Sequence, residues 1–195
     1  GVRGEEGPVD STPVDWALFV AEEKLAGALP GRWNHVRGVV ARARALARSL
    51  SLPPGERDLL VAAAAVHDIG LAPDVAVTKA SFLDGARWLA EQGAPARLVD
   101  LVAHCDCGQV EAALQGHEAE YARYRDEASP TRDALWYCCL TTGADGAPVS
   151  VAERIAAWAT TYAGDDVIAR YAVLARDELL AAVARTEDRL GGRAG

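Results

Sequence analysis

The segment AVHDIG (65–70) ends a run of alanines with His67 and Asp68, and this pair is the first candidate for chemistry in the sequence. Imidazole and carboxylate groups are both ligands of divalent metal ions. A buried aspartate without a partner is costly, and a bound cation removes that cost. Neighbouring side chains on a helix point about 100° apart, but at a helix end both can reach one ion. We therefore interpret the pair as half of a metal site.

Three of the four histidines fall at inward-facing positions or ends of apolar helices, namely His35, His67 and His104. A single histidine in such a place is usually a hydrogen-bonded core residue. Three on separate helices, one of them beside an aspartate, favour convergence on one ion. The fourth, His117, lies in the polar stretch GHEAEYARYRDE and is expected to be exposed. We therefore expect His35 to join His67 and Asp68 as a metal ligand.

The four cysteines occur as Cys105 and Cys107, one residue apart, and as the adjacent pair Cys138 and Cys139. Neither spacing is the C-x-x-C of a zinc ribbon or redox loop, and adjacent cysteines do not easily form a disulfide. We expect four free thiols. Cys107 and Cys138 are interpreted as small buried apolar residues, whereas Cys105 and Cys139 are candidates for a soft ligand or a nucleophile.

Apolar residues recur at helical spacing along most of the chain, which predicts an all-α bundle. The run over 57–68 is apolar on every side and should lie in the centre of the bundle. The remaining helices are expected over 15–29, 33–50, 83–92, 95–105, 111–127, 131–142, 150–162 and 167–190, the last two as an antiparallel pair. No glycine-rich phosphate-binding loop is present.

The chain has 195 residues and a net charge of −8. We expect one all-α domain over 14–190, a flexible Gly- and Pro-rich lead-in over 1–13 and a tail over 191–195. The acidic balance argues against binding to a nucleic-acid polymer or an anionic membrane. No apolar stretch is as long as a membrane span and no signal pattern opens the chain. We expect a cytoplasmic protein with a small-molecule substrate. Whether it forms a homo-oligomer stays open.

A family resemblance follows from His35, the segment HDIG at 67–70, and the later segments DGARWLAEQGAP, LVAH, RDALWY and LTTGADG. Together they resemble the small bacterial branch of the HD-domain superfamily of metal-dependent phosphohydrolases. The resemblance implies a helical bundle that binds Mn²⁺, Zn²⁺, Fe²⁺ or Mg²⁺ and hydrolyses phosphate esters or nucleotides with water activated by the metal. It implies that His35, His67 and Asp68 are ligands and that His104 contacts a second metal or the phosphate.

The sequence departs from this branch at three polar positions of the site. Cys139 stands where the branch normally has its fourth ligand, an aspartate, while Cys105 and Ser81 each stand where it has a histidine. Loss of the aspartate removes negative charge and weakens a site for Mg²⁺ or Mn²⁺, which prefer oxygen ligands. A thiolate at position 139 would instead suit Zn²⁺ or Fe²⁺. The metal site is therefore interpreted as altered from that of its relatives.

Three functional hypotheses remain open, and the sequence favours an enzyme. The first is a hydrolase of the HD type, with Asp68 or His104 assisting proton transfer and Lys79 steadying a phosphate, although a loop lysine is usually only solvated. The second is a scaffold with different small-molecule chemistry, assisted by Cys105 or Cys139, or by iron held by two histidines and one carboxylate. The third is a non-catalytic remnant used for binding.

Overall fold

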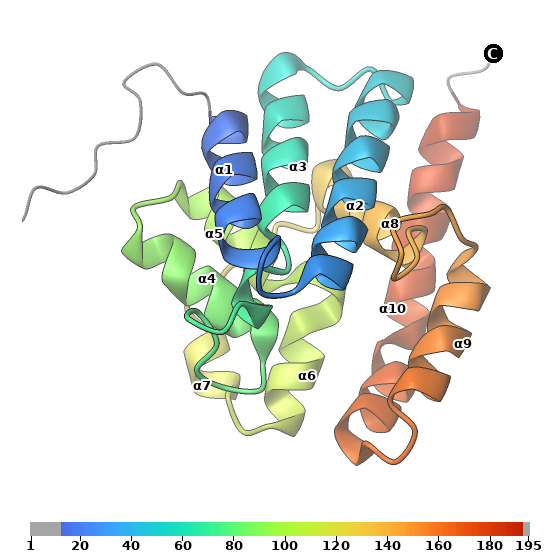
Figure 1. Cartoon of the computed structure of the whole chain (residues 1–195). Coiled ribbons are helices and arrows are strands. Elements are labelled where there is room, and N and C mark those ends of the chain that lie inside the picture. Colours follow the sequence, from blue (N-terminus) through green and yellow to red (C-terminus); the bar gives the residue numbers. More distant parts are fainter. Residues whose placement is uncertain (1–12, 193–195) are drawn as a thin grey trace, which may run out of the picture.

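The computed structural model describes residues 13–192, which form ten α-helices and two short 3-10 helices without a β-strand (Figure 1). This confirms the predicted all-α fold. The lead-in over 1–13 and the tail over 191–195 lie outside the described residues, apart from Pro13, Gly191 and Gly192. The elements are α1 (Pro13–Leu25), α2 (Pro30–Ser49), α3 (Pro54–Val66), η1 (Ile69–Leu71), α4 (Ser81–Glu91), α5 (Ala96–Ala103), η2 (Cys105–Cys107), α6 (Gly108–Leu114), α7 (Glu118–Tyr121), α8 (Pro130–Leu140), α9 (Val151–Thr161) and α10 (Asp166–Gly191).

Helix α3 is the centre of the bundle, as its all-round apolar sequence predicts. Every residue from Leu60 to Val66 is at most 2% exposed. The helix packs against α1, α2, α5 and α8, and α1 and α2 lie beside it in Figure 1. Its four consecutive alanines allow these neighbours to approach closely from several sides. The C-terminal end of α3, which carries the His-Asp pair, is therefore held inside the protein.

The helix starts follow from local sequence signals. Prolines occupy the first turns of α2, α3 and α8, where a missing backbone N–H costs nothing. Ser129 and Ser150 cap α8 and α9, because each side chain accepts a hydrogen bond from a backbone N–H of the first turn. The predicted helix over 111–127 was wrong: Gly116, with φ +82°, ends it, and only the short α6 and α7 form.

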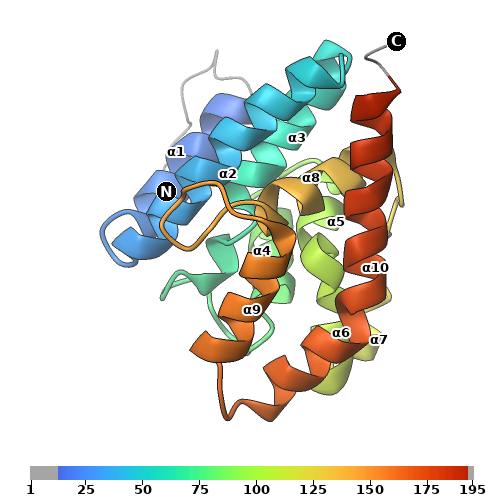
Figure 2. The same cartoon turned by 90° about the vertical axis from the view of Figure 1, so that its right-hand side faces the viewer.

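Helices α9 and α10 form the predicted antiparallel pair at one side of the bundle (Figure 2). A buried carboxylate fixes α10 to α8: Asp133, 1% exposed, accepts hydrogen bonds from Arg185 and Arg189 of α10 and from its own neighbour Arg132. None of the helices within residues 13–192 has the length and apolar character needed to cross a membrane.

Candidate metal centre

The His-Asp pair lies in the turn between α3 and η1. Helix α3 ends at Val66, so His67 and Asp68 lie at its end rather than on its side. Gly70 follows at a point where the chain touches the start of α4. A Cβ atom on Gly70 would lie 1.8 Å from the backbone oxygen of Ser81 and 2.7 Å from the backbone nitrogen of Gly85. The glycine of AVHDIG is therefore required for close packing, and this packing fixes the turn that carries the pair.

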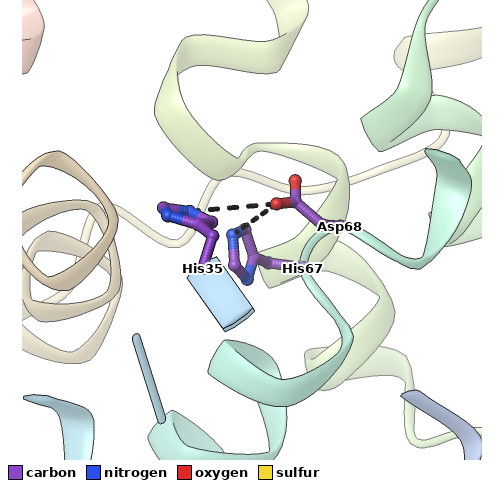
Figure 3. Close-up of side chains that lie close together, drawn as sticks. All are labelled: His35, His67 and Asp68. Carbon is purple, nitrogen blue, oxygen red and sulfur yellow. Dashed lines mark ion pairs between the residues drawn. The ribbon is translucent and has the colours of Figure 1, made fainter. Parts of the chain in front are cut away.

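His35, on α2, completes a compact triad with His67 and Asp68 (Figure 3). Nε2 of His67 lies 3.2 Å from Oδ2 of Asp68, and Nε2 of His35 lies 3.9 Å from the same oxygen. The candidate ligand atoms of the three residues all lie within 4.8 Å of one another, and all three residues are buried. The structure thus brings together the three residues predicted as metal ligands.

The opposite ring nitrogens of both histidines are bonded to the backbone. Nδ1 of His35 donates to the oxygen of Gly143 at 2.8 Å, and Nδ1 of His67 donates to the oxygen of Ala64 at 2.7 Å. Because a carbonyl oxygen can only accept, each Nδ1 carries the proton and each neutral ring has its lone pair on Nε2. Two such lone pairs facing a carboxylate oxygen repel one another unless a proton or a cation lies between them. This donor set fits a divalent metal ion.

Burial and charge set the protonation of the triad when no ion is bound. Burial opposes ionisation of Asp68, but His67, Arg32 and His35 hold the pKa of its carboxyl far below the usual range. Burial lowers the pKa of His35 to about 4. For His67 the charges of Asp68 and Cys139 outweigh burial and raise the pKa well above its ordinary value. A single proton on His67 therefore occupies the position that suits a cation.

The triad lines a cavity of about 1050 Å³. Two arginines, Arg32 and Arg154, line the same cavity. Nη1 of Arg32 lies 3.3 Å from Oδ2 of Asp68. Arg154, on α9, is only 8% exposed, and its Nε has no hydrogen-bond partner among the described residues. Burial and the charge of Arg32 lower the pKa of Arg154. Two guanidinium groups that face the same cavity provide a site for an anion.

Cys105 and Cys139 lie close to this centre. Their Sγ atoms are 3.8 Å apart, and His67 lies close enough to Cys139 to influence its ionisation. Burial opposes ionisation of the Cys139 thiol, but hydrogen bonds from Cys105 and His67 and the charge of His67 lower its pKa to about 6. Burial raises the pKa of Cys105 well above its usual range. All four cysteines are free and buried, as expected from their spacing.

His104 does not belong to the triad, although it was predicted for the same site. Its Nε2 donates to the backbone oxygen of Tyr124 at 2.9 Å, its Nδ1 lies 3.3 Å from Oε1 of Gln109, and its ring packs edge-on against Tyr121. His104 is not among the described residues that line the cavity. Nε2 is used within the protein and His104 does not line the cavity, which argues against contact with a metal or a phosphate.

The cavity wall includes polar residues that the sequence pattern did not assign to a site. Arg154 and Asp106 belong to this group, and His117, expected to be exposed, is half-buried there. Lys79 and Ser81 also line the cavity. Arg32 could have been found, since it lies one turn before His35 on the same helix. Arg154 could not, because only the tertiary packing of α9 brings it to the centre.

Comparison with protein families assigns the chain. The HD-domain model matches residues 32–159, about two thirds of the chain, including the triad, Cys105 and Cys139. No significant match was found among curated proteins or solved structures. The expectation from His35 and HDIG is thus confirmed at the level of the family, on a helical fold whose buried triad occupies the matched range. The chain belongs to the HD-domain family.

Proposed function

We propose that this protein is a divalent-metal-dependent phosphohydrolase that acts on a small phosphorylated or nucleotide substrate. One observation carries the proposal: the His35–His67–Asp68 triad opens into the same cavity as Arg32 and Arg154. A site for a cation beside a site for an anion is the arrangement that phosphoryl transfer requires. Membership of the HD-domain family supports the same class of reaction.

The triad would hold the ion through Nε2 of His35, Nε2 of His67 and the carboxylate of Asp68. The carbonyl groups of Gly143 and Ala64 keep the two rings oriented and neutral, which preserves their ability to bind a metal. Asp68, with its strongly lowered pKa, stays ionised and suits a ligand better than a proton donor. A bound divalent ion would supply a Lewis acid that activates water and polarises a phosphoryl group.

The arginines define the expected substrate charge. Arg154 is buried near the guanidinium group of Arg32, and its Nε lacks a hydrogen-bond partner within residues 13–192. A phosphate group would satisfy that N–H and relieve the repulsion between the two guanidinium groups. The remaining cavity wall includes Phe82, Trp158 and Tyr162. A volume of about 1050 Å³ with aromatic walls accommodates a ligand of nucleotide size.

The test is hydrolysis of a panel of nucleoside phosphates, sugar phosphates and phosphodiesters with Mn²⁺, Zn²⁺, Fe²⁺ or Mg²⁺ added in turn. We expect phosphate release with at least one ion, and its loss in His67→Ala. The matched control is His104→Ala, which changes a buried histidine that belongs neither to the triad nor to the cavity wall. Absence of hydrolysis with every ion, in protein shown to hold one, would overturn the proposal.

The thiol pair favours a second candidate, an HD scaffold with different chemistry. Cys139 replaces the aspartate of the resembled branch, and His67 lowers the pKa of its thiol. The variant Cys139→Asp separates the two functions. If it creates or greatly raises phosphatase activity, the native protein is not a phosphohydrolase of the ordinary kind. If hydrolysis is already efficient and changes little, the first proposal stands. Loss of a native activity in Cys139→Ser would instead implicate the thiol.

A further inference from the structure

A second group of ligand atoms lies beside the triad. Cys105 and Asp106 belong to η2, and Cys139 belongs to α8. Both sulfurs and a carboxylate oxygen of Asp106 lie within 4.8 Å of one another, and all three residues are buried. We call these three residues the thiol cluster. They come from segments 34 positions apart in the chain, so their meeting depends on the tertiary fold.

We propose that the thiol cluster is a binding site for a thiophilic divalent cation such as Zn²⁺, with Cys105, Cys139 and Asp106 as its protein ligands. The thiol cluster shares no residue with the His35–His67–Asp68 triad, and its proposed role does not depend on the chain being a hydrolase. Any protons held by Cys105, Cys139 and Asp106 would be released to solvent on binding, so the cation meets two thiolates and one carboxylate.

The spacing of the sulfurs agrees with this assignment. Zinc–thiolate bonds are about 2.3 Å long, and a tetrahedral angle then separates two sulfurs on one ion by about 3.8 Å. The Sγ atoms of Cys105 and Cys139 lie 3.8 Å apart. A disulfide would require about 2.05 Å between them. The two thiols therefore already have the separation of a metal-bound pair without a change in the backbone.

Asp106 provides an independent indication of a ligand. Its side chain is 7% exposed, and Oδ1 has no hydrogen-bond partner among the described residues. A buried carboxylate oxygen without a partner costs stability, and an ion held by the neighbouring sulfurs would supply that partner. Most other buried carboxylates in the protein are satisfied, as Asp84 is by Arg87 and Thr78. Among the described residues, Asp106 is thus the only buried carboxylate with a buried oxygen that lacks a hydrogen-bond partner.

The surroundings allow an ion to enter and to be held. Asp106 lines the large cavity, which gives the cluster a route to solvent. Arg154, whose charge acts on Asp106, offsets part of the negative charge that two thiolates and a carboxylate would carry. Both conditions, an entry path and a compensated charge, are expected of a metal site in a protein interior.

The test is a titration with Co²⁺ of protein purified anaerobically, freed of metal with a chelator and kept reduced. We expect an ultraviolet sulfur-to-cobalt charge-transfer band that Zn²⁺ abolishes. Cys105→Ala and Cys139→Ala should each raise the dissociation constant for Co²⁺ at least about tenfold, the scale on which even outer-shell changes weaken metal sites. Cys138→Ala is the matched control, because Cys138 is equally buried and adjacent to Cys139 but outside the cluster.

Two further variants complete the design. Asp106→Asn keeps the size of the side chain and should weaken Co²⁺ binding, which tests the cluster even if a cysteine variant fails to fold. His35→Ala removes a triad ligand and should leave the charge-transfer band in place. Failure of the metal proposal for the triad can therefore be distinguished from failure of the proposal for the thiol cluster. Absence of the band in the wild-type protein, or a Cys105–Cys139 disulfide in the anaerobic preparation, would overturn the proposal.

Discussion

Nε2 of His67 lies 3.2 Å from Oδ2 of Asp68, although consecutive residues of a helix point in different directions. The approach is possible because α3 ends at Val66 and the backbone of Asp68 leaves the helical region, with φ −103° and ψ 9°. The pair therefore depends on the end of the helix as much as on its two side chains. Changes that extend or displace this turn should disturb the metal centre even when they touch no ligand.

The first prediction concerns the ligands themselves. His67→Ala should lose the bound divalent ion, because it removes one of three ligands and leaves Asp68 without its nearest neighbour. His104→Ala should keep the ion, since Nε2 of His104 donates to Tyr124 and the residue does not line the cavity. Elemental analysis of both proteins, purified without a chelator, makes the comparison. Loss of the metal in His104→Ala alone would contradict this assignment.

The helical pattern and the residue types were sufficient to predict the fold and to select His35, His67 and Asp68. Helical periodicity shows which face of a segment points inward, so the three buried polar residues were recognisable one by one. It does not show which inward-facing residue reaches a cavity, and His104 was selected for this reason although it packs against Tyr121. Which of the buried polar residues meet depends on packing between helices.

The same limit explains the residues that sequence reasoning missed. Arg154 has the spacing of an ordinary helical arginine, and only the position of α9 brings it into the cavity. Asp106 adopts a left-handed backbone conformation, with φ 48°, in a turn that the sequence presented as the end of one helix. Gly116 was also passed over, and the predicted helix over 111–127 consequently ran too long.

The second prediction tests the glycine that supports the turn. Gly70→Ala should lower the free energy of unfolding by about 3 kcal/mol, because the new methyl group overlaps the backbone of Ser81. Gly55→Ala is the control: a Cβ atom there meets nothing within 4 Å, and the change should raise stability by about 0.5 kcal/mol. Urea denaturation measures both. Equal stability of the two variants would show that η1 can move away from α4.

The third prediction concerns the anion site. Arg154→Gln should raise the dissociation constant for inorganic phosphate about tenfold, because a charge-assisted hydrogen bond is lost. The metal content should stay unchanged, since Arg154 is not one of the triad residues. Arg170→Gln, at an exposed position of α10, is the control. Calorimetric titration with phosphate reports the binding, and an unchanged affinity in Arg154→Gln would remove the arginine from the substrate site.

The last prediction is a dependence of stability on pH that arises from Glu111, a residue of the cavity wall. Burial, followed by the charge of Asp165, raises the pKa of Glu111 to about 7. Between its unfolded value of 4.5 and about 7 the native state holds a proton that the unfolded state releases, so stability falls as pH rises.

Replacement of Glu111 by Gln should remove this part of the pH dependence. Wild-type protein should lose about 2 kcal/mol more than Glu111→Gln between pH 5 and pH 8, a figure reduced from the full shift because the side chain is partly exposed. Urea denaturation of both proteins at the two pH values measures the difference, and the variant should be the more stable at pH 8. Parallel pH profiles for the two proteins would mean that Glu111 is already ionised at neutral pH in the folded state.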